Sequence, residues 1–152
     1  MLRKINPEFN KISINGPREA VCVARAALLD EDKIDQEKEH LFAIGLDSDR
    51  RIKFLDLVCL GTMTTVSAHP RELFRRAVIE GAHSLVILHN HPTRDLIPSK
   101  NDIKFTQRCI AAGKILGIEM AQSLIFSAES NDYFKIPKNL PGAVRLIDIS
   151  QP

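Results

Sequence analysis

Cysteine is scarce in this sequence, and the cysteines that occur are far apart. Cys22, Cys59 and Cys109 are odd in number and stand in apolar surroundings. They form neither a disulfide framework nor a paired metal-binding motif. We therefore expect three buried free thiols and a reducing compartment.

Long apolar runs and targeting segments are also lacking. No stretch approaches the roughly 18 apolar residues that a membrane span needs. Residues 1–7 do not contain the apolar centre of a signal peptide. These absences predict a cytoplasmic protein with no membrane partner.

A strong charge of one sign is missing as well, since the formal net charge is only +2. Nucleic-acid-binding domains are usually marked by a clustered basic stripe. Arg71, Arg75 and Arg76 fall on one expected helix, but Glu72 and Glu80 are interleaved with them. A solvated helix face is the simpler interpretation. A nucleic-acid partner is left open, without support from the charge.

What the sequence does contain suits one compact domain. Its 152 residues are 44% apolar, and a chain of this length buries roughly 70% of its unfolded surface without needing a metal to fold. A metal, if one binds, would therefore serve function. We expect a single domain over 1–152, with its core over about 17–136.

The order of helical and strand patterns predicts the fold class. Proline at 17 and 70 opens helices, and glycine at 81 and 117 ends them. Gly61 is expected to mark a bulge. The expected elements are an irregular or strand-like arm over 1–15, helices from 17, over 70–80 and over about 99–116, and strands over 40–46, 51–60, 63–67, 84–89, 118–127 and 133–136. This order predicts an α/β fold, a mixed sheet with helices on its faces.

The segment His89-Asn90-His91-Pro92 carries the clearest chemical signal. Its two histidines end a buried strand, and at this spacing both imidazoles project from one face. Asp102 begins the next helix and can bring a carboxylate back to the same ion. Two imidazoles and a carboxylate leave a fourth tetrahedral position for water, as catalytic zinc requires.

Simpler interpretations exist for each half of this pattern. Two histidines spaced by one residue occur by chance. Ser99 and Asp102 also match a helix capping box, with aspartate in place of Glu or Gln. Capping does not explain the two histidines, so the complete pattern is more specific than either half. His40, His69 and His83 are expected to be structural or to face solvent.

The complete pattern, His-x-His, seven residues, Ser, two residues and Asp, resembles the JAMM (MPN-plus) signature of zinc-dependent deubiquitinases and their prokaryotic relatives. The resemblance is closest to the RadC-like branch and covers about Pro17 to Ile136. Its blocks in this sequence are Glu39-His40-Leu41-Phe42, Leu46-Asp47, Gly61-Thr62, His69-Pro70-Arg71-Glu72, His89-Asn90-His91-Pro92 and Pro98-Ser99.

The resemblance implies a cytidine-deaminase-like JAB/MPN fold of three layers and a single Zn²⁺ held by His89, His91 and Asp102. It also implies a glutamate ahead of the first strand that acts as general base. That residue is Glu39 here, with Glu37 as the alternative if the register slips.

The resemblance implies one more catalytic group and shows two departures. Ser99 matches the family serine that donates a hydrogen bond to the oxyanion. Gln122-Ser123 replaces a usual Asp-His pair, and Thr93-Arg94 replaces a usual Ser-Gly pair. Because a serine hydroxyl is a poor zinc ligand, we expect Ser123 to leave the fourth position to water.

These observations favour a zinc-dependent hydrolase, a metalloprotease-type enzyme that acts on an amide or isopeptide bond of a peptide or protein. The alternative is a zinc-binding interaction module in DNA repair or mobile-element biology with little hydrolysis. A metal nuclease is less favoured, because phosphoryl transfer more often uses several carboxylates and two metals. The helix-hairpin-helix region of longer relatives is expected to be absent. The sequence does not indicate the substrate or the oligomeric state.

Overall fold

The computed structural model describes residues 7–61 and 69–139. The strand expected over 63–67 lies outside these residues. The elements in chain order are η1 (Pro7–Lys11), α1 (Pro17–Leu29), α2 (Lys33–Gln36), β1 (Glu39–Leu46), β2 (Ile52–Gly61), α3 (Pro70–Glu80), β3 (Ser84–His89), α4 (Lys100–Leu116), β4 (Glu119–Phe126) and β5 (Tyr133–Lys135).

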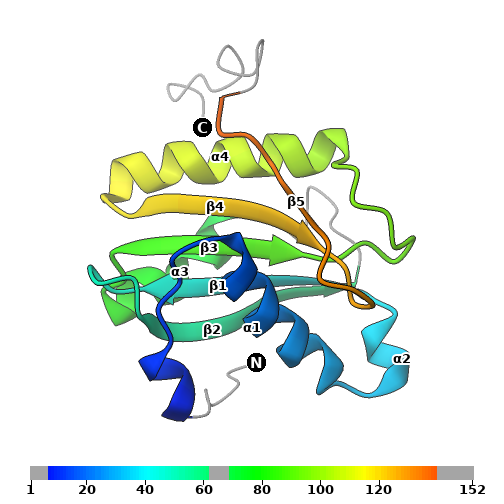
Figure 1. Cartoon of the computed structure of the whole chain (residues 1–152). Coiled ribbons are helices and arrows are strands. Elements are labelled where there is room, and N and C mark those ends of the chain that lie inside the picture. The colour runs from blue at the N-terminus through cyan, green and yellow to red at the C-terminus, as the bar shows by residue number, and fades with distance from the viewer. Residues whose placement is uncertain (1–6, 62–68, 140–152) are drawn as a thin grey trace.

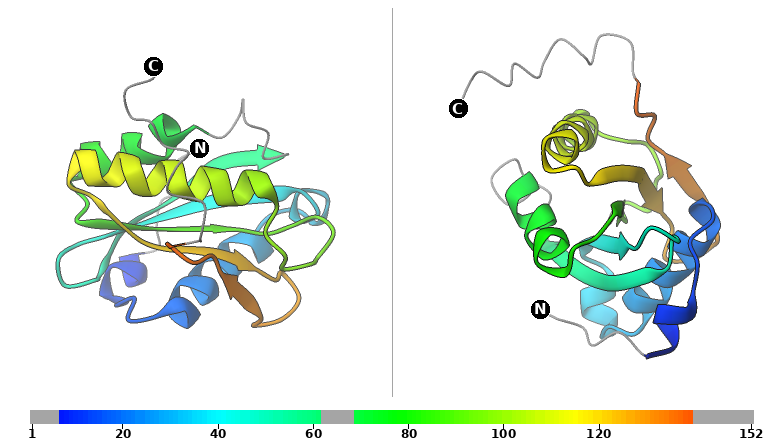
Figure 2. Two further views of the ribbon diagram at one scale, coloured as in Figure 1. Left: turned by 90° about the horizontal axis from the view of Figure 1, so that it is seen from above. Right: turned by 90° about the vertical axis from the view of Figure 1, so that its left-hand side faces the viewer.

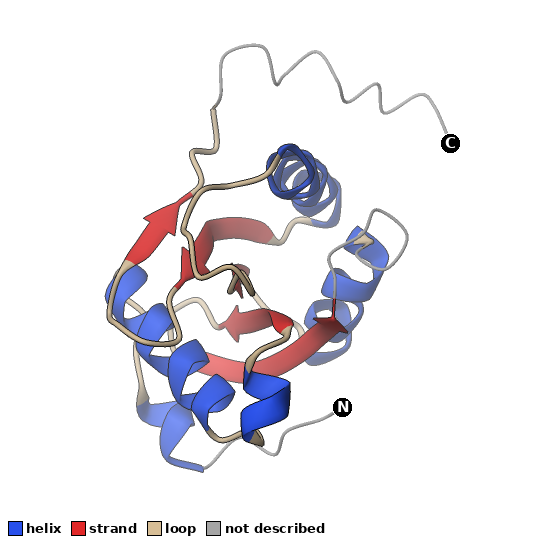
Figure 3. Cartoon of the chain, turned by 90° about the vertical axis from the view of Figure 1, so that its right-hand side faces the viewer, coloured by secondary structure: helices blue, strands red, loops and turns tan. Residues whose placement is uncertain are grey.

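The described strands form one mixed sheet in the order β2-β1-β3-β4-β5. β1 pairs antiparallel with both β2 and β3, whereas β3 and β4 are parallel. The helices lie on both faces of the sheet, as Figures 1 and 3 show. The expected α/β class and its three-layer arrangement are therefore confirmed.

Each face of the sheet has its own apolar core. On one face, α1 packs its buried side chains against Phe42, Ile44 and Val86. On the other face, α3 and α4 cover Ala43, Ile87 and their neighbours; the two views in Figure 2 show this layering. β3 is buried along its whole length because both of its faces are covered. This burial on both faces explains the continuous apolar sequence of β3.

Prolines and glycines in the sequence mark several of the helix boundaries. α1 and α3 each begin with a proline, where the missing N–H leaves no hydrogen bond unmade. Gly81 and Gly117 follow α3 and α4 in the left-handed conformation, with φ of 65° and 70°, which glycine adopts without strain. None of the helices in residues 7–61 and 69–139 is long and apolar enough to cross a membrane.

Several expectations need correction. The irregular arm contains a short 3-10 helix, η1, and the polar stretch after α1 contains α2. The register shifts fall within β2 opposite Leu41/Phe42 and Gly45/Leu46, whereas Gly61 pairs with Glu39 at the strand end. Cys22 is exposed and Cys59 is half-buried, so only Cys109 is a buried thiol. Cys22 lies on the solvent side of α1, which a cysteine among apolar neighbours did not reveal.

Candidate metal centre

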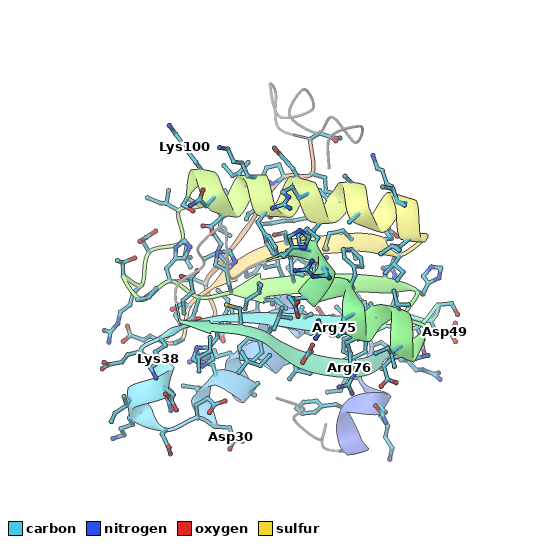
Figure 4. All side chains as sticks on the ribbon, turned by 180° about the vertical axis from the view of Figure 1, so that it is seen from behind. Asp30, Lys38, Asp49, Arg75, Arg76 and Lys100 are labelled. Atoms are coloured by element: carbon cyan, nitrogen blue, oxygen red, sulfur yellow. The ribbon has the colours of Figure 1, made fainter. Side chains whose placement is uncertain are left out.

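The sheet register brings two distant segments to the same end of the molecule. β1 and β3 are antiparallel, and Leu41 pairs with His89, so the start of β1 lies beside the end of β3. The loop after β3 then returns the chain to the start of α4. Figure 4 shows Lys38, just before β1, and Lys100, the first residue of α4, at this same end.

Four side chains gather at this end of the sheet. Each of Glu39, His89, His91 and Asp102 offers a ligand atom, and these atoms all lie within 4.8 Å of one another. His89 and Asp102 are almost inaccessible to solvent, whereas Glu39 and His91 are half-buried. The group therefore has a closed side and an open side.

Three of these side chains form a compact triangle. Nε2 of His89 and Nε2 of His91 are 3.1 Å apart. Asp102 completes the triangle, its Oδ2 lying 3.0 Å from His91 Nε2 and its Oδ1 lying 3.3 Å from His89 Nε2. Four tetrahedral ligands at about 2.0–2.1 Å from zinc stand roughly 3.3–3.4 Å from one another. The donor set and its spacing therefore fit a divalent metal ion such as zinc.

Asp102 belongs to both the helix start and the cluster. Its backbone N–H donates to Ser99 Oγ at 3.1 Å, and its own Oδ2 accepts from the Ser99 N–H at 2.8 Å. The expected capping box is therefore present. Burial alone would raise the pKa of Asp102, but the hydrogen bonds from His89 and His91 outweigh it and lower the pKa. The carboxylate remains ionised, as a metal ligand must be.

His91 is oriented from its other ring nitrogen. Its Nδ1 lies 3.1 Å from the Asp95 carbonyl oxygen and 3.4 Å from Asp95 Oδ1. Ligand histidines commonly donate their second N–H to such an oxygen, which fixes the tautomer and aims the other nitrogen at the metal. The loop is itself ordered, since Asp95 accepts from the hydroxyl of Thr93 and the N–H of Ile97.

A pocket of about 270 Å³ opens onto the cluster. Glu39, His91, Ser99 and Asp102 contribute to its lining, and the remaining lining residues are Pro92, Thr93, Asp95 and Ile97. Every candidate site residue except the deeply buried His89 therefore faces one pocket. Glu37 is exposed beyond α2 and is not part of the cluster, so the structure brings Glu39 and not Glu37 to the two histidines and Asp102.

The three other histidines have ordinary structural explanations. His69 caps α3, its Nδ1 accepting from the Arg71 N–H at 3.0 Å. His83 is exposed before β3. His40 is buried beside Phe42, with ring centroids 5.7 Å apart, and its Nδ1 lies 2.8 Å from the Lys38 carbonyl oxygen.

Ser123 is not part of the cluster. Its hydroxyl is 2.8 Å from that of Thr106, and both side chains are buried. Thr106 follows Asp102 by one turn of α4, so the family histidine that Ser123 replaces would point toward the helix just below the carboxylate. The Ser123 hydroxyl is therefore hydrogen-bonded to Thr106 within the core.

The sequence pattern did not identify Asn90 or Asp95 as part of the site. Both stand within the loop that connects β3 to α4. Asp95 follows His91 by four residues, a separation that a tight turn can bridge. Such a turn is present here, since the Arg94 N–H donates to the His91 carbonyl oxygen at 2.9 Å. Asn90 contacts residues fifty positions away, which no local pattern could indicate.

In the metal-free protein, the same contacts predict a pH dependence of stability. The hydrogen bond to Asp102, opposed by burial, raises the pKa of His91 from its ordinary 6.5 to about 8. A raised pKa stabilises the fold fully below the ordinary value and loses that contribution as pH rises through the higher one. The chelator-treated protein should therefore have a lower melting temperature at pH 9 than at pH 6.

The matched variant is His91→Gln, in which this part of the pH dependence should vanish. Differential scanning fluorimetry of both proteins across pH 6–9 measures the effect. A rising melting temperature in the metal-free wild type, or the same slope in both proteins, would contradict the assignment of the pKa to the contact between His91 and Asp102.

Comparison with known proteins identifies the family. A family model described as the RadC-like JAB domain matches residues 14–139. The chain belongs to this family. This RadC-like JAB domain thus contains the mixed sheet, the helical layers and the cluster of Glu39, His89, His91 and Asp102 described above.

Curated relatives support the same conclusion. A UPF0758 protein of Chlorobium chlorochromatii is 41% identical over 93 residues, which is 61% of this chain and 42% of the relative. A UPF0758 protein of Desulforudis audaxviator is 37% identical over 74% of this chain and 47% of its own. A UPF0758 protein of Desulforamulus reducens is 36% identical over 78% of this chain and 50% of its own. The RadC-like JAB domain described here thus spans about half the length of these relatives.

Proposed function

We propose that this RadC-like JAB domain is a zinc-dependent hydrolase that cleaves an amide or isopeptide bond in a peptide or protein. The observation that carries the proposal is the meeting of Glu39, His89, His91 and Asp102 in one cluster, three of which, all but the buried His89, also line one pocket. Two imidazoles and one carboxylate are the ligand set of several catalytic zinc sites, and the glutamate is a base within reach of them.

The protein side of the site has two parts. His89 and His91 would hold the ion through Nε2, and Asp102 through its carboxylate, from the buried side. A bound zinc ion supplies Lewis acidity, which lowers the pKa of water to about 7 and polarises a carbonyl group. Asp95 would keep His91 in the required tautomer through Nδ1.

The open side of the pocket carries the groups that move protons. The Glu39 carboxylate would take a proton from the attacking water and deliver it to the nitrogen of the leaving amine. Ser99 Oγ accepts the Asp102 N–H, so its own proton is directed to a different partner. At the pocket lining, that proton can be donated to the oxyanion of the tetrahedral state.

Metal analysis and a hydrolysis assay together test the proposal. Purified protein loaded with zinc would be incubated with a mixed-peptide library and, separately, with single-stranded DNA. We expect one zinc per chain, peptide cleavage that a chelator abolishes, and intact DNA. Cleavage of DNA alone would overturn the choice of substrate class. Stoichiometric zinc without any turnover would favour the interaction module. Stoichiometric iron in the purified protein before zinc is added would overturn zinc, because iron accepts the same ligand set.

The role of Ser99 gives a prediction that separates stability from chemistry. Ser99→Ala should lose the cap and about 1 kcal/mol of stability, whereas Ser99→Gly should lose only a few tenths, because glycine is a tolerated N-cap. Both lack the hydroxyl, so both should lose hydrolysis by up to about 100-fold to 1,000-fold. Denaturant unfolding and peptide turnover measure the two effects. Turnover that follows stability across the two variants would show that Ser99 only caps the helix.

A further inference from the structure

The side chain of Asn90 makes two hydrogen bonds that bracket Glu39. Its Oδ1 accepts the backbone N–H of His40 at 2.7 Å, and its Nδ2 donates to the carbonyl oxygen of Lys38 at 3.1 Å. Asn90 itself is only 4% exposed. One buried amide therefore holds the main chain on both sides of residue 39.

The sheet explains why a side chain is needed at this point. The ladder between β1 and β3 ends with Leu41 opposite His89, because the chain turns away after His89 toward the loop. Main-chain groups of β1 beyond Leu41 thus lose their neighbours on that edge. The Asn90 amide, which has one acceptor and one donor side like a peptide group, takes the place of the missing rung.

The position of Asn90 in the chain links this rung to the metal ligands. Asn90 stands between His89 and His91, and its neighbours are the two imidazole donors of the triangle. On its other edge, Glu39 is held by pairing with Gly61 of β2. The main chain that carries Glu39 is therefore held by a buried amide that is not part of the pocket lining.

We propose that Asn90 is a positioning residue, whose side chain sets the placement of Glu39 relative to His89 and His91. The inference rests on the proposed function, in which Glu39 is the base. A displacement of about 1 Å at a reacting group can cost about 100-fold in rate. The ligand triangle does not depend on the amide bonds, so metal binding should be largely preserved when they are lost.

Asn90→Leu removes both hydrogen bonds at similar size and is the principal test. With zinc present, the His40 amide should exchange hydrogen at least about tenfold faster by NMR. Zinc affinity, measured by competition with a chelating dye, should stay within about threefold, while peptide-library turnover falls about 100-fold. The matched control is Thr106→Val, which breaks a different buried side-chain bond on α4 and should leave all three readouts unchanged.

A double-mutant comparison identifies the residue through which Asn90 acts. In a Glu39→Gln background, Asn90→Leu should cause no further loss of turnover, because the base is already missing. An additional 100-fold loss there would overturn the inference. A fall in zinc affinity that matches the fall in turnover would also overturn it, since Asn90 would then be acting on the ligands.

A second variant guards against failure to fold. Asn90→Asp keeps an acceptor for the His40 N–H but loses the donor to the Lys38 carbonyl oxygen, so its turnover should lie between wild type and Asn90→Leu. If both variants are unfolded with zinc bound or added, the residue is structural and the inference is wrong. If Glu39→Gln alone leaves turnover unchanged, the proposed function fails instead, and exchange at His40 still reports whether the rung exists.

Discussion

Protein in which both His89 and His91 are replaced by alanine should retain no zinc after dialysis, while its fold persists. Four-ligand zinc sites contribute about 10–16 kcal/mol, so each lost ligand weakens binding by roughly 100-fold to 1,000-fold. The two imidazoles are two of the three side chains in the triangle. Apolar residues build the cores on both faces of the sheet, so we expect the fold to persist without the metal.

His83→Ala is the control for this experiment, since His83 is exposed at the opposite end of β3. It should keep wild-type zinc. Zinc content by plasma emission spectroscopy and circular dichroism on the same samples complete the measurement. Unchanged zinc in a folded His89→Ala/His91→Ala protein would remove the basis of the metal centre and of the hydrolase with it.

Replacing Glu39 by glutamine should reduce hydrolysis to a small residual rate and leave both zinc and fold in place. An amide has no basic site for the proton that the carboxylate accepts, and general base catalysis contributes about 100-fold to 10,000-fold. Glu39 lies within the cluster but opposite the buried ligands, at the half-exposed side of the pocket. Turnover should therefore fall while bound zinc stays unchanged, with both quantities measured on one preparation.

Glu37→Gln provides the matched control for Glu39. It removes the same charge two residues away, where the side chain is exposed and outside the cluster. We expect wild-type turnover in this variant. Loss of activity in Glu37→Gln with retention in Glu39→Gln would show that the base comes from the other register.

The parts of the fold that the sequence predicted well are those with local signals. The bounds of α3 follow from Pro70 and Gly81, and those of β3 follow from a continuous apolar run. η1 and α2 were missed because four or five residues give too short a pattern to show periodicity. Cys22 was misplaced because its neighbours on α1 are apolar but face the core.

The site residues differ in the same way, since some are close in sequence and one is placed by a long-range contact. His89, His91 and Asp102 lie within one strand, one loop and one helix start, so their spacing was enough to place them together. Glu39 was chosen only through the family resemblance, because an acidic stretch gives no reason to prefer one carboxylate. Its placement depends on the pairing of β1 with β3, a long-range contact that composition and periodicity do not encode.

This division of the site has a consequence for how the protein matures. The three proposed metal ligands span only residues 89–102, and closing so short a loop costs little chain entropy. We therefore expect the unfolded chain to capture a metal ion as well, which would reduce the net stabilisation that the ion gives to the native state. Glu39 joins only when β1 has paired with β3 across some fifty residues, a slower event. During refolding, metal uptake should thus precede activity, and the interval between them measures the time that the central strand pair needs to form.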